Sequence, residues 1–110
     1  MRYLDLTKFP ELDDEKMQKI FESNPNMFSK LENLIIRANR SLTPLTLVNL
    51  SKYCKNLKFL DVKWNNKIID KNSSSLISQN CPLIEYLSIG WNNKVVDDSV
   101  LNQFLPLNIV

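Results

Sequence analysis

The sequence contains no histidine, one glycine and two cysteines. Without histidine, a catalytic thiolate lacks its usual base, and two cysteines alone, Cys54 and Cys81, do not make a zinc site. A single glycine argues against a glycine-rich phosphate loop and against tight hairpin turns. We therefore expect a protein that is not an enzyme and that carries no cofactor and no metal centre.

Long apolar runs and a strong excess of one charge are also absent. No stretch approaches the roughly 20 apolar residues that cross a bilayer, and a net charge of +2 gives no reason to expect a polyanionic ligand. The opening residues, MRYLDLTKFPELDDE, include acidic side chains and lack the apolar core of a secretory signal. We predict a cytoplasmic protein, with the nucleus as the alternative, that binds no membrane and keeps Cys54 and Cys81 as free thiols.

What the sequence does contain is a repeated phrase. KWNNKIID at residues 63–70 closely matches GWNNKVVD at residues 90–97. Three segments around it align without gaps at steps of 26 and 27 residues, which indicates a repeat architecture. Each segment has apolar residues at relative positions 1, 4 and 6 and an asparagine at position 9: Leu31, Leu34, Ile36 and Asn39; Leu57, Leu60, Val62 and Asn65; Ile84, Leu87, Ile89 and Asn92. A looser copy opens the chain, with Met1, Leu4 and Leu6 in the apolar positions and Phe9 in place of the asparagine.

A helical segment follows each strand-like one. The predicted N-caps are Asp13, Thr43 (followed by proline), Asp70 and Asp97. The pairs Asn24-Pro25 and Cys81-Pro82 are expected to end two of the helices. The carboxylate pairs Asp13-Asp14 and Asp97-Asp98 lie at helix starts, so we interpret them as capping residues rather than as catalytic acids.

A strand and a helix in every 26 or 27 residues, with the pattern L-x-x-L-x-L-x-x-N, resembles the leucine-rich repeat family. Cys54 and Cys81, each three residues before the first apolar strand position, are similar to the cysteine-containing subclass behind the F-box in substrate receptors of ubiquitin ligases. The resemblance implies an α/β leucine-rich repeat solenoid, a short right-handed βα superhelix with parallel strands on its concave face and helices on its convex face. It implies one domain over residues 1–110, with repeats at 1–30, 31–56, 57–83 and 84–108. Ser73 stands where the family has an apolar helix residue, which we attribute to the extra residue in the 27-residue step.

In such a stack, the apolar strand positions point inward as two columns, Leu4, Leu34, Leu60, Leu87 and Leu6, Ile36, Val62, Ile89. The asparagines are expected to satisfy buried backbone groups where the chain leaves each strand. Apolar residues near both ends of the chain predict a fragment of a longer array without end caps, a protein reduced from a larger ancestor, or self-association through Leu105, Leu107 and Ile109.

The remaining strand positions are expected to point to the open side of the sheet. Across the repeats they form the columns Tyr3, Asn33, Phe59, Tyr86; Asp5, Ile35, Asp61, Ser88; Thr7, Arg37, Lys63, Gly90; and Lys8, Ala38, Trp64, Trp91. Exposed aromatic rings beside arginine are typical of binding hot spots. We predict a partner-binding site of Phe59, Trp64, Tyr86, Trp91, Arg37, Lys63 and Asp61. The alternative for the two tryptophans is that they stack and shield a neighbouring loop.

We therefore expect a non-catalytic module that binds another protein through its concave sheet. The family resemblance implies that this partner is a ubiquitin-ligase component or its substrate. The segment FPELDDEKMQKIF is only superficially similar to an F-box, and we interpret it as the helix of the first repeat. One alternative is single-stranded nucleic-acid binding, which Asp5, Asp61 and the near-neutral charge disfavour; another is an enzyme-inhibitor type of repeat protein.

Overall fold

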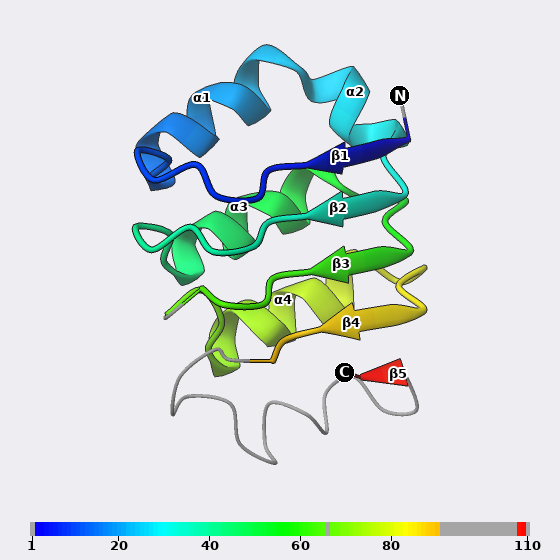
Figure 1. Ribbon diagram of the computed structural model, residues 1–110. Coiled ribbons are helices and arrows are strands. Elements are labelled where there is room, and N and C mark those ends of the chain that lie inside the picture. Colours follow the sequence, from blue (N-terminus) through cyan, green and yellow to red (C-terminus); the bar gives the residue numbers. More distant parts are fainter. Residues whose placement is uncertain (1, 66, 91–107, 110) are drawn as a thin grey trace.

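The computed structural model describes residues 2–65, 67–90 and 108–109. Within these residues, five short parallel strands form one sheet in the order in which they follow one another along the chain, and four helices lie on one face of it (Figure 1). The protein is therefore an α/β protein in which each strand pairs with the next strand along the chain. The predictions for Trp91, Asn92, Asp97, Leu105 and Leu107 concern positions outside the described residues.

Helices connect the first four strands, so that each of these strands begins at the same end of the sheet. The strands are β1 (Tyr3–Asp5), β2 (Asn33–Ile35), β3 (Phe59–Asp61), β4 (Tyr86–Ser88) and β5 (Asn108–Ile109). The helices are α1 (Asp14–Ser23), α2 (Pro25–Lys30), α3 (Pro44–Tyr53) and α4 (Lys71–Asn80). Among the described helices, none combines the length and the apolar character that a membrane crossing requires.

The register of the strands follows the apolar pattern of the sequence. Leu34, Leu60 and Leu87 lie side by side on β2, β3 and β4, and none is more than 1% exposed. The second inward column, one residue past the ends of these strands, is also buried, with Ile36, Val62 and Ile89 at 5% exposure or less. On the edge strand β1, Leu4 and Leu6 are only partly buried, because no described strand lies on their outer side. Both predicted columns are confirmed for the described residues.

Three predicted N-caps begin helices as expected. The carboxylate of Asp13 accepts the Lys16 N–H at 2.8 Å at the start of α1, and Thr43 caps α3 ahead of a proline. At α4, the Asp70 carboxylate accepts the Ser73 N–H at 2.7 Å, while the Ser73 hydroxyl oxygen accepts the Asp70 N–H at 2.9 Å. Ser73 is therefore the second half of a capping box, which gives this buried polar residue a structural role beyond a shift of register.

Asp14 connects the first helix to the third. Its carboxylate accepts the Thr43 N–H at 3.0 Å and both hydroxyls of Thr43 and Thr46. The first carboxylate pair of the sequence thus lies at a helix start, as predicted, and one member also holds two neighbouring helix N-termini together.

The chain continues as a second helix after α1, where the sequence predicted only an end. Asn24 closes α1 with its N–H on the Phe21 carbonyl at 3.2 Å, and Pro25 then begins α2. Proline is favoured at the first helical position because it has no N–H to leave unpaired there. The extra helix buries Phe28, whose ring packs edge-on against Phe21 with centroids 4.8 Å apart.

Candidate functional site

A ladder of two asparagines lies where the chain leaves β2 and β3, at one end of the open face, which is the sheet face that carries none of the described helices. Asn39 and Asn65 are fully buried. The Asn39 Oδ1 accepts the Phe9 N–H at 2.7 Å, and the Asn65 Oδ1 accepts the Asn39 N–H at 2.8 Å. Their amide groups donate to backbone carbonyls of their own and the preceding turn, including Leu6 at 2.7 Å and Val62 at 2.9 Å. The predicted role of the asparagine column is confirmed at these two positions.

The residue before each ladder position lies in an unusual backbone conformation. Lys8, Ala38 and Trp64 have positive φ angles of 59°, 56° and 63°, while the one glycine of the chain has none. The left-handed region is unfavourable for a residue with a Cβ by about 1–2 kcal/mol. The turn therefore imposes this conformation whatever side chain occupies the position. Trp64 occupies it with 49% of its surface exposed.

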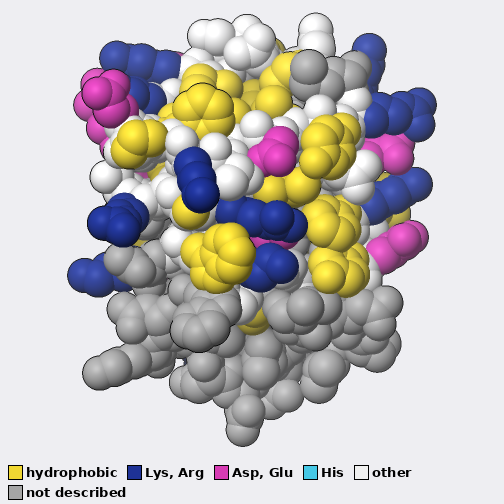
Figure 2. Space-filling model, in the orientation of Figure 1, with side chains coloured by type: hydrophobic (Ala, Val, Ile, Leu, Met, Phe, Trp, Pro, Cys, Tyr) yellow, Lys and Arg dark blue, Asp and Glu magenta, His cyan; other side chains and the backbone are white. Residues whose placement is uncertain are grey.

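An aromatic pair dominates the open face. The strand register places Phe59 opposite Tyr86, and their rings stack with centroids 4.5 Å apart and planes 7° from parallel. Tyr3 lies in the same column on β1 and is 55% exposed. Figure 2 shows hydrophobic side chains gathered over the strands on this face, with basic side chains beside them. The expectation that Phe59 and Tyr86 lie together on the open side is confirmed.

The prediction that Asp61 is exposed on this face is wrong. Asp61 is 1% exposed, and Ile35 and Ser88 beside it on β2 and β4 are also buried. The Arg37 side chain forms an ion pair with one Asp61 oxygen, with its Nε at 2.6 Å, and the other oxygen accepts the Lys63 N–H at 3.0 Å. The position of a residue in a strand determines the face to which its side chain points, but a short side chain on the open face can still be buried by longer side chains beside it. Asp61 therefore positions Arg37 rather than offering a carboxylate to a partner.

Arg37 and Lys63 lie one strand apart and differ in their surroundings. The hydrogen bond that Arg37 donates to Asp61, with the charges of Asp61 and Asp5, raises the pKa of the Arg37 guanidinium, while desolvation acts against it. Arg37 keeps 33% of its side chain exposed. The position on β4 that corresponds to Asp61 is Ser88, so Lys63 has no such carboxylate across the strand.

The structure thus brings together part of the predicted site. Phe59 and Tyr86 stack, and Arg37 pairs with Asp61 beside Lys63. Trp64 lies three residues after the end of β3 and makes no ring contact with another described aromatic residue. The predicted neighbour Trp91 lies outside the described residues, so the stacking alternative for the two tryptophans remains a hypothesis.

The two cysteines are buried thiols at the ends of helices. Cys54 and Cys81 are C-caps of α3 and α4, are at most 2% exposed and form no disulfide. Desolvation by burial raises the pKa of both, that of Cys81 to about 11. Thiols that are protonated and buried are poor nucleophiles, so they act as apolar filling at the corner between helix and strand. This confirms the interpretation made from the sequence.

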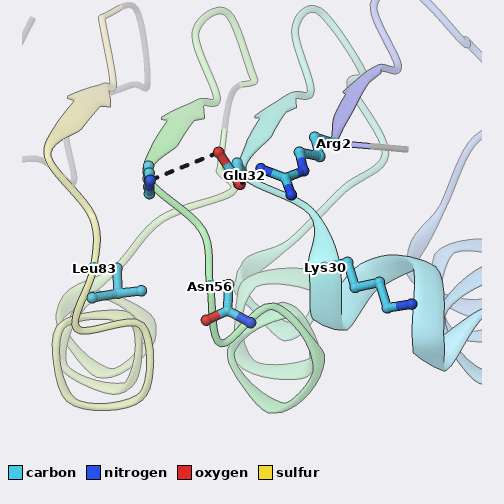
Figure 3. Close-up of a pocket in the computed structure, with 6 residues that line it drawn as sticks. Arg2, Lys30, Glu32, Asn56 and Leu83 are labelled. Carbon is cyan, nitrogen blue, oxygen red and sulfur yellow. Dashed lines mark hydrogen bonds and ion pairs between the residues drawn. The ribbon is translucent and has the colours of Figure 1, made fainter.

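A charged pocket that we did not predict from the sequence lies where the strands begin, at the end away from Trp64. It has a volume of about 380 Å³ and is lined by Arg2, Lys30, Glu32, Asn56, Lys58 and Leu83 (Figure 3). Glu32 pairs with Arg2 at 2.8 Å and with Lys58 at 3.8 Å. A sequence pattern that indicates these ion pairs is the alternation of charge one position before the aromatic column, in the order Arg2, Glu32, Lys58 and Glu85.

Within the described part of the chain, no three His, Cys, Asp or Glu side chains are arranged to hold a metal ion. The open face provides stacked rings, a half-exposed tryptophan and basic groups. No protein-family model and no curated protein matches the chain.

Proposed function

We propose that this protein is a non-catalytic interaction module of the leucine-rich repeat type that binds a partner protein through the open face of its sheet. The proposed solenoid is supported by parallel strands in sequence order, by the aligned leucines Leu34, Leu60 and Leu87, and by the asparagine ladder. Repeats of this kind bury their apolar faces only by stacking, which leaves the strand face without helices free for a partner.

Trp64 carries the functional part of the proposal. Its backbone is in a conformation that disfavours any residue with a Cβ, and its half-exposed ring recovers only part of that energy through burial. Lys8 and Ala38 show that the fold accepts small or polar residues at the same position. A tryptophan there contributes more to contact with a partner than to folding, and tryptophan is the residue type most enriched at binding hot spots.

A narrower form of the proposal makes the partner a substrate or component of a ubiquitin ligase. It depends on the family resemblance of Cys54 and Cys81 and of the repeat pattern, which is an argument by analogy. We expect a native pull-down with the full chain to recover a ligase scaffold protein. Recovery of partners without any scaffold protein would reject the ligase role and leave the interaction role in place.

The interaction role is tested by crosslinking in cells. A photo-crosslinking amino acid replaces Phe59 on the open face and, as the matched control, Leu45 on α3, which is 54% exposed on the helix side. We expect a discrete protein adduct from position 59 and none of the same mass from position 45. Equal adducts from both positions, or nucleic-acid adducts from position 59, would contradict the proposed function.

A further inference from the structure

Two rows of side chains cross the strands on the open face. The aromatic row consists of Tyr3, Phe59 and Tyr86 in one register column of the sheet, with Asn33 between Tyr3 and Phe59. The basic row consists of Arg37 and Lys63, just beyond the carboxyl ends of β2 and β3, together with Lys8, which follows β1 and lies one position further along, in the column of Trp64. In Figure 2, basic side chains lie beside the hydrophobic ones on the face turned to the viewer.

The two rows are separated by a strip in which little protrudes on β2, β3 and β4, whereas Asp5 on β1 is exposed. Lys63 follows Phe59 by four positions, which is a distance of about 13 Å along extended backbone. The strip between them contains the buried residues Ile35, Asp61 and Ser88. The length of the strip from β1 to β4 is three strand spacings of about 4.8 Å each. An extended peptide segment spans this length with about five residues.

The charges of the basic row are available to a partner. Among the described residues, neither the Lys8 nor the Lys63 ammonium forms an ion pair, and a third of Arg37 remains exposed after it pairs with Asp61. Asp5 opposes them, but one of its oxygens already accepts the N–H and the hydroxyl of Thr7. A partner segment with carboxylates on the side of this row would meet complementary charge.

We propose, on the basis of the proposed function, that the partner presents an extended acidic segment that crosses the strands. Side chains of an extended chain point alternately to opposite sides. Alternating apolar and acidic residues therefore place apolar groups on the aromatic row and carboxylates on the basic row. The segment that fits best is a short stretch of a protein in which Glu or Asp alternates with Leu, Val or an aromatic residue.

Nucleic acid fits this face less well. Phe59 and Tyr86 already stack on each other with centroids 4.5 Å apart, so no base can insert between them. The pair itself therefore uses one face of each ring, and base stacking needs exposed ring faces.

The test uses the full chain and labelled peptides of about ten residues, long enough to cross the strip. One peptide alternates Glu with Leu, a second has the same composition in two blocks, and a third alternates Lys with Leu. Fluorescence anisotropy measures each affinity. We expect the alternating Glu peptide to bind at least about tenfold more tightly than either of the others. Equal affinity for the block peptide or the Lys peptide would overturn the proposal.

A charge reversal provides the second arm. Lys63→Glu should weaken binding of the Glu peptide by about tenfold and strengthen binding of the Lys peptide. The matched control Lys52→Glu alters the net charge equally on an exposed position of α3 and should leave both affinities unchanged. Circular dichroism verifies that both variants are folded. An equal loss in the control variant would contradict the assigned row.

Failure of this inference is distinguishable from failure of the proposed function. If the chain crosslinks a protein from position 59 but does not prefer the alternating Glu peptide, the interaction role stands and the acidic segment is wrong. If position 59 gives no protein adduct, the proposed function itself is wrong. A single-stranded oligothymidine that binds more tightly than every peptide would replace the acidic segment with nucleic acid.

Discussion

The side-chain oxygen of Asn65 accepts the backbone N–H of Asn39 at 2.8 Å, although the two residues are 26 positions apart in the sequence. Both residues are fully buried. The same Asn65 amide donates to carbonyls of Ile36, Val62 and Lys63, so one side chain holds backbone from two consecutive turns. This bond connects neighbouring strand–helix units at the point where the open face ends.

The first prediction concerns this ladder. Asn65→Ala leaves a buried N–H and buried carbonyls without partners, and we expect the free energy of unfolding to fall by about 2–3 kcal/mol. Chemical denaturation monitored by circular dichroism measures it. The matched variant Asn72→Ala, on an exposed position of α4, should change stability by less than about 0.5 kcal/mol. Similar effects in both variants would mean that the ladder does not stabilise the turn.

The second prediction concerns the pair Arg37 and Asp61. Arg37→Met leaves the Asp61 carboxylate buried without its cation, and we expect a loss of about 1–3 kcal/mol in the free energy of unfolding. Adding Asp61→Asn removes the charge but keeps the oxygen that accepts the Lys63 N–H. The double variant should therefore recover part of the loss. A double variant that loses the sum of both single effects would show that the two residues do not interact.

The third prediction concerns the positive φ angle at Ala38, where a glycine is expected to be more favourable than it is at position 90. Ala38→Gly relieves a positive φ of 56° and should raise the free energy of unfolding by about 0.5–1 kcal/mol, as part of the relief is offset by chain entropy. Gly90→Ala should be tolerated, because its φ is not positive and the nearest atom to an added Cβ is Lys63 Cδ at 3.6 Å. Thermal denaturation compares the two variants. Destabilisation by Ala38→Gly would contradict the assigned turn.

The fourth prediction concerns pH. The pKa of the Cys81 thiol is raised from 9.0 to about 11 by burial, so the unfolded chain releases this proton at lower pH than the folded protein does. The thiol's contribution to stability is complete below pH 9 and is lost as pH rises from 9 towards 11. Cys81→Ala should show a shallower decline over that interval in urea denaturation. Parallel profiles for the two proteins would mean that the thiol is not buried in solution.

The sequence predicted the strands and their register because each repeat carries the same physical pattern. Apolar positions such as Leu34 and Leu60 must face inward, and a polar amide such as Asn65 is tolerated in the core only where it meets free backbone groups. Capping chemistry likewise located the starts of α1, α3 and α4. These features are local, and a single repeat already contains them.

Other features depended on neighbours that one repeat does not reveal. The pair Asn24-Pro25 predicts only a helix end, because proline cannot continue α1, yet Pro25 starts α2, which packs Phe28 against Phe21. Alternation with buried positions predicts that Asp61 is exposed, yet Arg37, which follows the adjacent strand β2, pairs with it and Asp61 is buried. The positive φ at Trp64 was also unexpected, because no glycine marks it.

The most direct test of the interaction role is the variant Trp64→Gly. Loss of a half-buried ring and relief of a positive φ are opposite effects of about 1 kcal/mol each, so we expect the stability to stay within about 1 kcal/mol of the wild type. Ala38→Gly makes the same backbone change without removing a ring and serves as the control. Affinity for the partner crosslinked at position 59 is then measured for both variants. The account predicts at least about a tenfold loss for Trp64→Gly and none for Ala38→Gly; a Trp64→Gly protein that binds as tightly as the wild type would contradict it.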